Sequence, residues 1–302
     1  MPISGFTEET VTASGVTLNV ASGGAGSPIL LLHGFPETHL AWRHVAPALA
    51  EHHHVVCPDL PGYGASGPPG DTVEAYSKRN TAAVVVELMR QLGHDRFALV
   101  GHDRGALVAY RAALDHPGAL THVGMIDVIP AQDMWASLTG VTGAFAFHLY
   151  LLAQPPDLPE RMIGADPDLF FGHFIDTWAP EPATVPPDVR AAYLDATRSP
   201  AVIHAICQDY RAGAFVDPQH DADDRKAGRR IDVPALAIWQ DPGDMRLPFD
   251  PEAVWRGWAP DLRTAVLPGG HFLPESRPDD VTRAIRDLLD AGDPAENLDS
   301  PN

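Results

Sequence analysis

Residues 97–107 read FALVGHDRGAL, an apolar run that leads directly into a polar segment bounded by two glycines. A short continuous apolar run predicts a strand covered on both faces, and helical spacing begins at Gly105. Gly101 and Gly105 leave space for a tight strand-to-helix turn, which presents Asp103 at the carboxyl end of the sheet. Gly-x-Asp-x-Gly is an acid-bearing version of the G-x-S-x-G nucleophile turn, so we predict that Asp103 is a nucleophile. The alternative is that Asp103 only caps the helix.

The bulk composition is that of a soluble globular protein, with 302 residues, 45% hydrophobic residues and a net charge of −19. This charge argues against binding to nucleic acids or anionic membranes. Cys57 and Cys207 are far apart and predict two buried thiols. We find no signal peptide and no apolar stretch long enough to span a membrane, so we expect a cytoplasmic protein with a small-molecule substrate. A homodimer remains an open alternative to a monomer.

Strands and helices alternate along most of the chain, which predicts an α/β fold with a mostly parallel sheet flanked by helices. The alternation stops at residues 131–222, a helical segment rich in aromatic residues and proline. We therefore expect a core made of residues 1–130 and 223–292, a helical insertion between them, and a disordered tail at 293–302. The expected elements are a hairpin at 9–23, strands at 28–34, 54–59, 97–101, 121–130, 234–240 and 263–271, and helices at 41–51, 77–93, 105–118, 251–258 and 278–292.

A histidine in a glycine-rich loop follows the last predicted strand, where LPGGHFLPE (267–275) contains His271. The order nucleophile, acid, histidine places the general base of an α/β-hydrolase at this point in the chain. The acid that orients His271 follows one of two strands: Asp127 lies in THVGMIDVIP (121–130) and Asp244 in WQDPGDMRLP (239–248). Either carboxylate would hold the tautomer of His271 and stabilise its charged form.

The segment HGFP (33–36) leaves an earlier strand with Phe35 between a glycine and a proline. The backbone N–H groups of Phe35 and Arg104 are placed to form an oxyanion hole. No H-E-x-x-H or Cys-x-x-Cys ligand set occurs, so we expect no metal and no organic cofactor. The run His52–His54 is expected to begin a strand rather than to bind a metal.

Together these motifs resemble the Asp-nucleophile branch of the α/β-hydrolase family, which contains haloalkane dehalogenases, epoxide hydrolases and haloacetate dehalogenases. The likeness is greatest to fluoroacetate dehalogenases and covers nearly the whole chain. The segments that carry it are LLLHGFPETH, DLPGYGAS, GHDRGA, LAQPPDLPE, DYRAGAF and GGHFLPE. The resemblance implies that 131–222 is a cap inserted after the sixth strand. It also implies that the acid follows that strand, which favours Asp127 over Asp244.

The resemblance also assigns roles in the substrate pocket. The family holds the leaving halide with a His-Trp pair and a tyrosine from the cap, which match His148 and Tyr210, while Leu149 stands at the Trp position. Two arginines one helical turn apart hold the substrate carboxylate. Arg104 matches the first and Leu107 stands at the second. A paired, bidentate arginine site holds a carboxylate better than one arginine does, so these departures put fluoroacetate turnover in question.

The expected activity is hydrolytic dehalogenation of short 2-haloacids, through an ester between the substrate and Asp103. Leu107 and Trp178 are expected to form walls of the pocket. An epoxide hydrolase with the same Asp103 and His271 machinery is the second interpretation, and the two leucines at polar positions of the family favour it. A third interpretation is a ligand-sensing protein on the same fold, because a fold alone does not establish catalysis.

Overall fold

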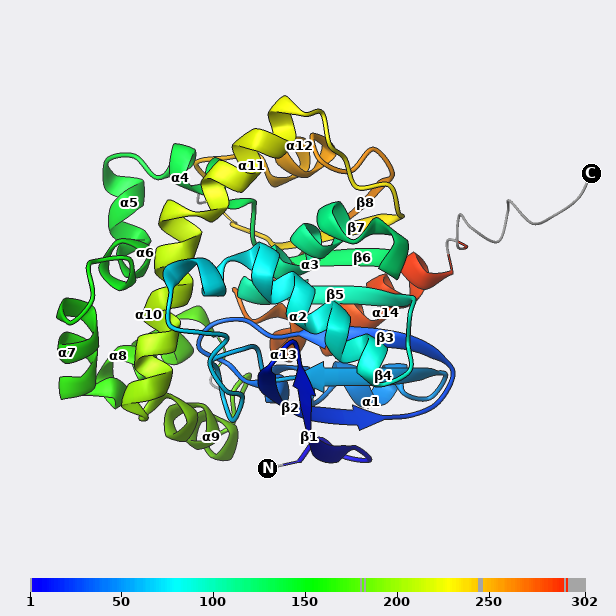
Figure 1. The fold of residues 1–302 in the computed structure, drawn as a ribbon, viewed down its shortest axis with the longest axis horizontal. Coiled ribbons are helices and arrows are strands. Elements are labelled where there is room, and N and C mark those ends of the chain that lie inside the picture. The colour runs from blue at the N-terminus through cyan, green and yellow to red at the C-terminus, as the bar shows by residue number, and fades with distance from the viewer. Residues whose placement is uncertain (1, 180, 182, 244–246, 291, 293–302) are drawn as a thin grey trace, which may run out of the picture.

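The computed structural model describes residues 2–179, 181, 183–243, 247–290 and 292 (Figure 1). Eight strands form one sheet in the order β1-β2-β4-β3-β5-β6-β7-β8. The β1–β2 and β2–β4 pairs are antiparallel and all the other pairs are parallel, which confirms the mostly parallel sheet. The strands are β1 (Thr7–Ala13), β2 (Val16–Gly23), β3 (Ser27–Leu32), β4 (His53–Pro58), β5 (Phe97–His102), β6 (Leu120–Ile126), β7 (Ala235–Gln240) and β8 (Leu262–Leu267).

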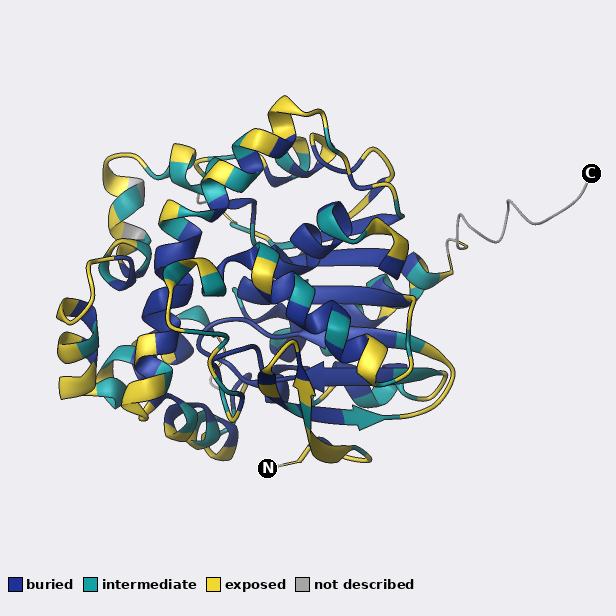
Figure 2. Ribbon diagram, in the orientation of Figure 1, coloured by how far each residue is buried: buried dark blue, intermediate teal, exposed yellow. Residues whose placement is uncertain are grey.

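Helices cover both faces of the sheet because the central strands carry apolar side chains on both sides. All residues of β5 are buried, and so are the last four of the six residues of β3 and six of the seven residues of β6 (Figure 2). Figure 1 shows α2 (Lys78–Gln91) and α3 (Arg104–Asp115) in front of the sheet, with α1 (Val45–Leu49) and α14 (Pro278–Leu289) behind it. The remaining short helices outside the insertion are η1 (His39–Trp42), η2 (Val73–Tyr76), η3 (Pro117–Ala119), α12 (Pro251–Arg256) and α13 (Leu273–Ser276).

The helix expected at 41–51 is wrong in extent. The structure has a 3-10 turn, η1, followed by the five-residue helix α1. Pro47 explains the late start of α1, because a proline has no N–H to donate and fits only in the first turn of a helix. The hairpin expected at 9–23 is confirmed: Ser14 and Gly15 both have positive φ, as the tight turn between β1 and β2 requires.

Within the described residues, the segment from β6 to β7 contains eight helices and no strand. They are α4 (Ala131–Ser137), α5 (Val141–Phe145), α6 (Phe147–Leu152), α7 (Leu158–Ala165), α8 (Pro167–Trp178), α9 (Pro187–Thr197), α10 (Pro200–Phe215) and α11 (Asp217–Lys226). Figure 1 shows them gathered beyond the carboxyl ends of the parallel strands. The expected boundary at 222 falls inside α11, so the helical segment continues to Lys226.

The core and cap division remains a prediction, and the tail at 293–302 lies outside the described residues. Both cysteines are buried free thiols, as expected. No helix in the described part of the chain is both long and apolar enough to cross a membrane. The same residues contain no group of three His, Cys, Asp or Glu side chains arranged to hold a metal ion.

Candidate active site

Asp103 occupies the sharp turn between β5 and α3. Its backbone has φ 48° and ψ −114°, a conformation that L-residues adopt only under strain. The turn needs both flanking glycines: a Cβ on Gly101 would lie 2.2 Å from the carbonyl of Gly105, and one on Gly105 would lie 2.3 Å from the Leu32 oxygen. The Asp103 side chain makes no capping hydrogen bond to α3, so the capping alternative does not describe it.

The Asp103 carboxylate instead points into the space beneath the cap segment. Its Oδ1 accepts a 2.8 Å hydrogen bond from the backbone N–H of Phe35, one of the two expected oxyanion donors. Gly34 permits this approach, because a Cβ there would lie 2.6 Å from the Asp103 Cβ. Oδ2 faces His271, whose Nε2 lies 3.8 Å away. The contribution of the Arg104 N–H to the oxyanion hole remains a prediction.

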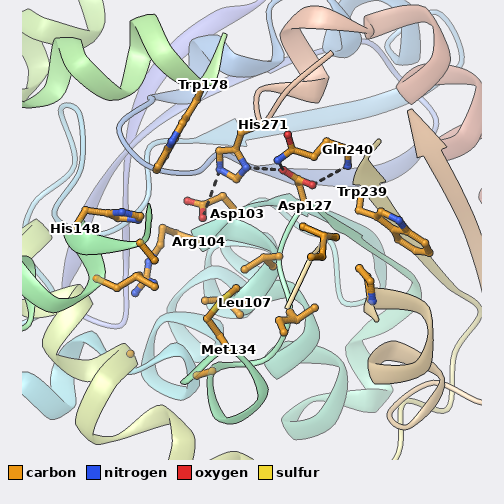
Figure 3. Close-up of a pocket in the computed structure, with 18 of the residues that line it drawn as sticks. Asp103, Arg104, Leu107, Asp127, Met134, His148, Trp178, Trp239, Gln240 and His271 are labelled. Atoms are coloured by element: carbon orange, nitrogen blue, oxygen red, sulfur yellow. Dashed lines mark hydrogen bonds and ion pairs between the residues drawn. The ribbon is translucent and has the colours of Figure 1, made fainter. Parts of the chain in front are cut away.

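His271 and Asp127 come together as expected (Figure 3). The His271 Nδ1 lies 2.6 Å from Asp127 Oδ2, and since a carboxylate only accepts, Nδ1 carries the proton. Asp127 follows the end of β6 with φ 57°. It accepts two further hydrogen bonds from Gln240, at 2.8 Å each, from the backbone N–H and the side-chain amide. The alternative acid, Asp244, lies outside the described residues.

A buried pair, His102 and Glu37, also holds the backbone of His271 in place, and the sequence did not predict it. The His102 Nε2 donates to the His271 carbonyl at 2.8 Å, and its Nδ1 donates to Glu37 Oε2 at 2.9 Å. Burial lowers the pKa of His102, but the carboxylates of Glu37, Asp103 and Asp127 together outweigh this effect and raise it to about 9. Both ring nitrogens therefore carry protons at neutral pH. His102 lies within the GHDRG motif, and this position was the signal in the sequence that could have identified it.

The electrostatic surroundings keep Asp103 ionised. Burial alone would raise the pKa of this carboxyl, but His271, Arg104 and His102 hold it below its usual value. An ionised carboxylate with one oxygen unoccupied by hydrogen bonds is the form that acts as a nucleophile. The His271 Nε2 has no hydrogen-bond partner among the described residues.

A cavity of about 710 Å³ opens in front of Asp103 (Figure 3). It is lined from both the sheet side and the cap segment. The expected site residues on its wall are Asp103, Arg104, Leu107, Asp127, His148, Leu149, Trp178, Tyr210 and His271. Trp178 packs against His271, with its ring centroid 4.8 Å from that of His271 and its carbonyl oxygen 3.1 Å from the His271 backbone nitrogen.

His148 and Tyr210 lie near each other at the cap side of this cavity, with ring centroids 5.9 Å apart. Burial lowers the pKa of His148 to about 3, so its ring is neutral. Burial and the nearby Asp103 raise the pKa of Tyr210 well above its usual value, so its hydroxyl keeps the proton. Both side chains can therefore donate a hydrogen bond without carrying charge. Leu149 lines the same cavity with an apolar side chain.

Arg104 forms an ion pair with the buried Asp209 on α10, a contact that the sequence did not predict. Its Nε donates to Asp209 Oδ2 at 2.7 Å and its Nη2 donates to the Asp209 carbonyl at 3.0 Å. The guanidinium also lies 4.3 Å from the Tyr210 ring centroid. Asp209 receives two more donors, the Lys78 ammonium and the Tyr63 hydroxyl. A buried carboxylate thus offsets the positive charge expected to bind the substrate.

Comparisons with known proteins cover nearly the whole chain. A family model described as the alpha/beta hydrolase fold matches residues 27–278. A fluoroacetate dehalogenase from a Burkholderia species is 41% identical over 288 residues, 94% of each chain. A soluble epoxide hydrolase from a Corynebacterium species is 29% identical and covers 90% of this chain and 93% of its own. A solved structure from Pseudomonas aeruginosa, provisionally described as an epoxide hydrolase, is 43% identical with TM-score 0.91, covering 96% of this chain and 97% of that one.

Proposed function

Because the chain belongs to the α/β-hydrolase family and is a hydrolase, we propose that it works through a covalent ester on Asp103. One observation carries this proposal. The Phe35 N–H holds Oδ1 of Asp103 while the unbonded Nε2 of His271 stands 3.8 Å from Oδ2. That separation is too long for a hydrogen bond, so the nucleophile is not neutralised by its neighbour.

In the first half-reaction Oδ2 of Asp103 attacks the electrophilic carbon in line. The new C–O bond forms as the bond to the leaving group breaks, and the leaving group departs with the electron pair. His148 and Tyr210 stand at the cap side, where both donate to the departing atom. The result is an alkyl ester whose carbonyl oxygen is Oδ1, already bound by the Phe35 N–H.

In the second half-reaction His271 Nε2 takes a proton from water, and the hydroxide attacks the ester carbonyl of Asp103. The negative charge develops on Oδ1, where the Phe35 N–H stabilises it. Asp127 stabilises the imidazolium through the 2.6 Å hydrogen bond. Collapse of the intermediate expels the alcohol, which takes up the proton from His271. Asp103 is left as the carboxylic acid, and release of its proton to solvent restores the carboxylate.

The substrate class supported by the whole-chain likeness is the 2-haloacid. The carboxylate of such a substrate is attached to the reacting carbon, so its anchor must lie beside the nucleophile. Arg104 follows Asp103 directly and is the only Arg or Lys among the described residues that line the cavity. Its bonds to Asp209 use Nε and Nη2, which leaves Nη1 for the substrate. Dehalogenation of 2-haloacids is therefore our first proposal.

A panel of chloroacetate, bromoacetate, fluoroacetate and styrene oxide tests the leaving group, with halide and diol release as the readout. We expect chloro- and bromoacetate to be turned over faster than fluoroacetate, because fluoride is the poorest leaving group and Leu149 supplies no N–H donor. Weak carboxylate binding beside Leu107 should appear mainly as a raised KM.

Epoxide hydrolysis is the second candidate, favoured by the apolar Leu107 and Leu149 and by the pairing of Arg104 with Asp209. The departing epoxide oxygen needs a proton, and Tyr210 keeps one at neutral pH. If the panel shows diol release from styrene oxide and no halide from any haloacid, the first candidate is wrong. Tyr210→Phe should then depress the epoxide activity severely.

Asp127→Asn should slow ester hydrolysis by roughly 10²- to 10⁴-fold, because an amide no longer stabilises the imidazolium of His271. Alkylation of Asp103 should be almost unaffected, so single-turnover experiments would show rapid halide release and slow ester decay. Asp244→Asn is the matched control and should have a smaller effect. The reverse ranking would assign the acid to the loop after β7.

Asp209→Asn should lower the KM for haloacids by roughly tenfold, because it frees a charge-assisted donor on Arg104. Asp217→Asn is the control: Asp217 accepts the backbone N–H of Lys78 at 2.9 Å, and Arg104 is not among its contacts. KM and kcat for bromoacetate are measured for both variants, with thermal unfolding to confirm that each is folded. An unchanged KM in folded Asp209→Asn would show that Arg104 does not bind the carboxylate.

A further inference from the structure

The cavity in front of Asp103 is much larger than the smallest substrates of the proposed reaction. On the scale of about 30 Å³ per water molecule, the five heavy atoms of chloroacetate fill on the order of 150 Å³. The cavity measures about 710 Å³. This size falls within the ~300–1,000 Å³ typical of sites for larger organic ligands. A two-carbon acid would leave most of the space unfilled.

The cavity has two ends with different chemistry (Figure 3). The catalytic end contains Asp103, His148 and His271, and Figure 3 shows His148 and Trp178 on one side of Asp103. Trp239 lies on the opposite side of Asp103 and Met134 lies below it. We call the part of the cavity beside Trp239 and Met134 the distal compartment, and we count the apolar lining residues Val128, Trp135, Leu247 and Phe249 of the same cavity as its wall with them.

The distal compartment is suited to an uncharged, apolar group. None of its described wall residues is charged, and the only side-chain N–H groups among them are the indole N–H groups of Trp135 and Trp239. The Trp135 indole N–H donates to the Gly213 carbonyl at 2.9 Å. The side-chain amide of Gln240, at the border with the catalytic end, donates to Asp127. A polar ligand group placed here would lose its hydrogen bonds to water and find few replacements.

The direction of attack also determines where the substituents of the reacting carbon lie. In an in-line displacement the nucleophile, the carbon and the leaving atom lie on one line. With the leaving atom at His148 and Tyr210, the other substituents of the carbon project to the sides of the line of attack, and Figure 3 shows Leu107 and Met134 below Asp103, to one side of that line. We propose that the substrate carries an apolar alkyl or aryl substituent on its reactive carbon and that the distal compartment binds it. This inference rests on the proposed function of Asp103.

The test is a chain-length series of secondary bromides, from 2-bromopropanoate through 2-bromohexanoate to 2-bromooctanoate, with the matching 1,2-epoxyalkanes. The parent protein should show kcat/KM rising about two- to fourfold per methylene group until the compartment is full. Met134→Trp should reduce kcat/KM for the long members at least tenfold and leave 2-bromopropanoate nearly unchanged. Leu247→Trp, placed on another wall, should act in the same direction if Met134→Trp fails to fold.

The matched control is Met162→Trp, the same substitution on α7, where the side chain is 57% exposed and lies outside the cavity. It should leave the whole series unchanged. Flat or falling kcat/KM along the series in the parent protein would overturn the inference while leaving the proposed function intact. Equal losses for short and long members in Met134→Trp would also overturn it.

Binding measured without turnover separates this inference from the catalytic proposal. In Asp103→Asn, the product analogue 2-hydroxyoctanoate should bind at least tenfold tighter than 2-hydroxypropanoate by calorimetry, and Met134→Trp should remove the difference. Equal affinities would overturn the inference. A different result would contradict the proposed function itself, namely undiminished turnover in Asp103→Asn.

Discussion

Asp103→Asn is expected to abolish turnover of every substrate, with a loss in kcat of at least about 10⁴-fold. An amide is nearly isosteric with the carboxylate and keeps an oxygen to accept the Phe35 N–H, but it is not a nucleophile. The variant should therefore remain folded, with an unfolding temperature close to that of the parent. Steady-state halide or diol release measures the loss, and intact-protein mass spectrometry excludes deamidation back to Asp.

Isotope labelling provides the matching positive result. In a single turnover in ¹⁸O water, the parent protein should incorporate the label into the Asp103 carboxyl group, because water attacks the ester carbonyl rather than the substrate carbon. The first product molecule should then contain unlabelled oxygen from Asp103. Label that appears directly in the product, with none in the peptide containing Asp103, would contradict the ester mechanism. So would parent-level activity in undeamidated Asp103→Asn.

His271→Ala should separate the two half-reactions. Alkylation of Asp103 needs no general base, so a burst of halide equal to the enzyme concentration is expected. Ester hydrolysis should then stall, because no group at 3.8 Å from Oδ2 can deprotonate water. Mass spectrometry should find a stoichiometric adduct on the peptide containing Asp103.

The same variant also tests the non-enzymatic alternative. A ligand-sensing protein would bind its ligand reversibly and would never accumulate an adduct. Asp103→Asn/His271→Ala is the control, since it should show neither burst nor adduct. If folded His271→Ala loses the burst as well, His271 acts in the first half-reaction and its assignment as a base for water is wrong.

The sequence predicted the parts of this molecule that depend on local patterns. The turn around Asp103 was predictable because strand, glycine spacing and helix are contiguous in residues 97–107. The order of motifs then indicated that His271, which follows the last predicted strand, is the general base. The family resemblance predicted that Asp127 contacts His271. The residues alone did not decide between Asp127 and Asp244 as the acid.

The contacts that the sequence did not predict are buried charge pairs between distant segments. Glu37 and His102 are 65 residues apart, and Arg104 and Asp209 are 105 residues apart. An Asp or Glu on a helix or loop is usually a solvated surface residue, so the burial of Glu37 and Asp209 was not expected, although both lie in segments that carry the family resemblance. Only the packing of α10 over the carboxyl ends of the strands brings Asp209 to Arg104. The Arg104–Asp209 pair reduces the positive charge expected in the pocket. The GHDRG motif alone could not reveal this pair.

Asp103 and Asp127 both hold positive φ angles, at 48° and 57°. Such sparsely populated backbone conformations cost residues with a Cβ roughly 1–3 kcal/mol, whereas glycine adopts positive φ readily. A glycine at either position would therefore relax the backbone and remove a carboxylate that the reaction needs. Selection for heat resistance alone would favour such inactive variants, so attempts to improve this protein by directed evolution must screen for turnover and thermal tolerance together.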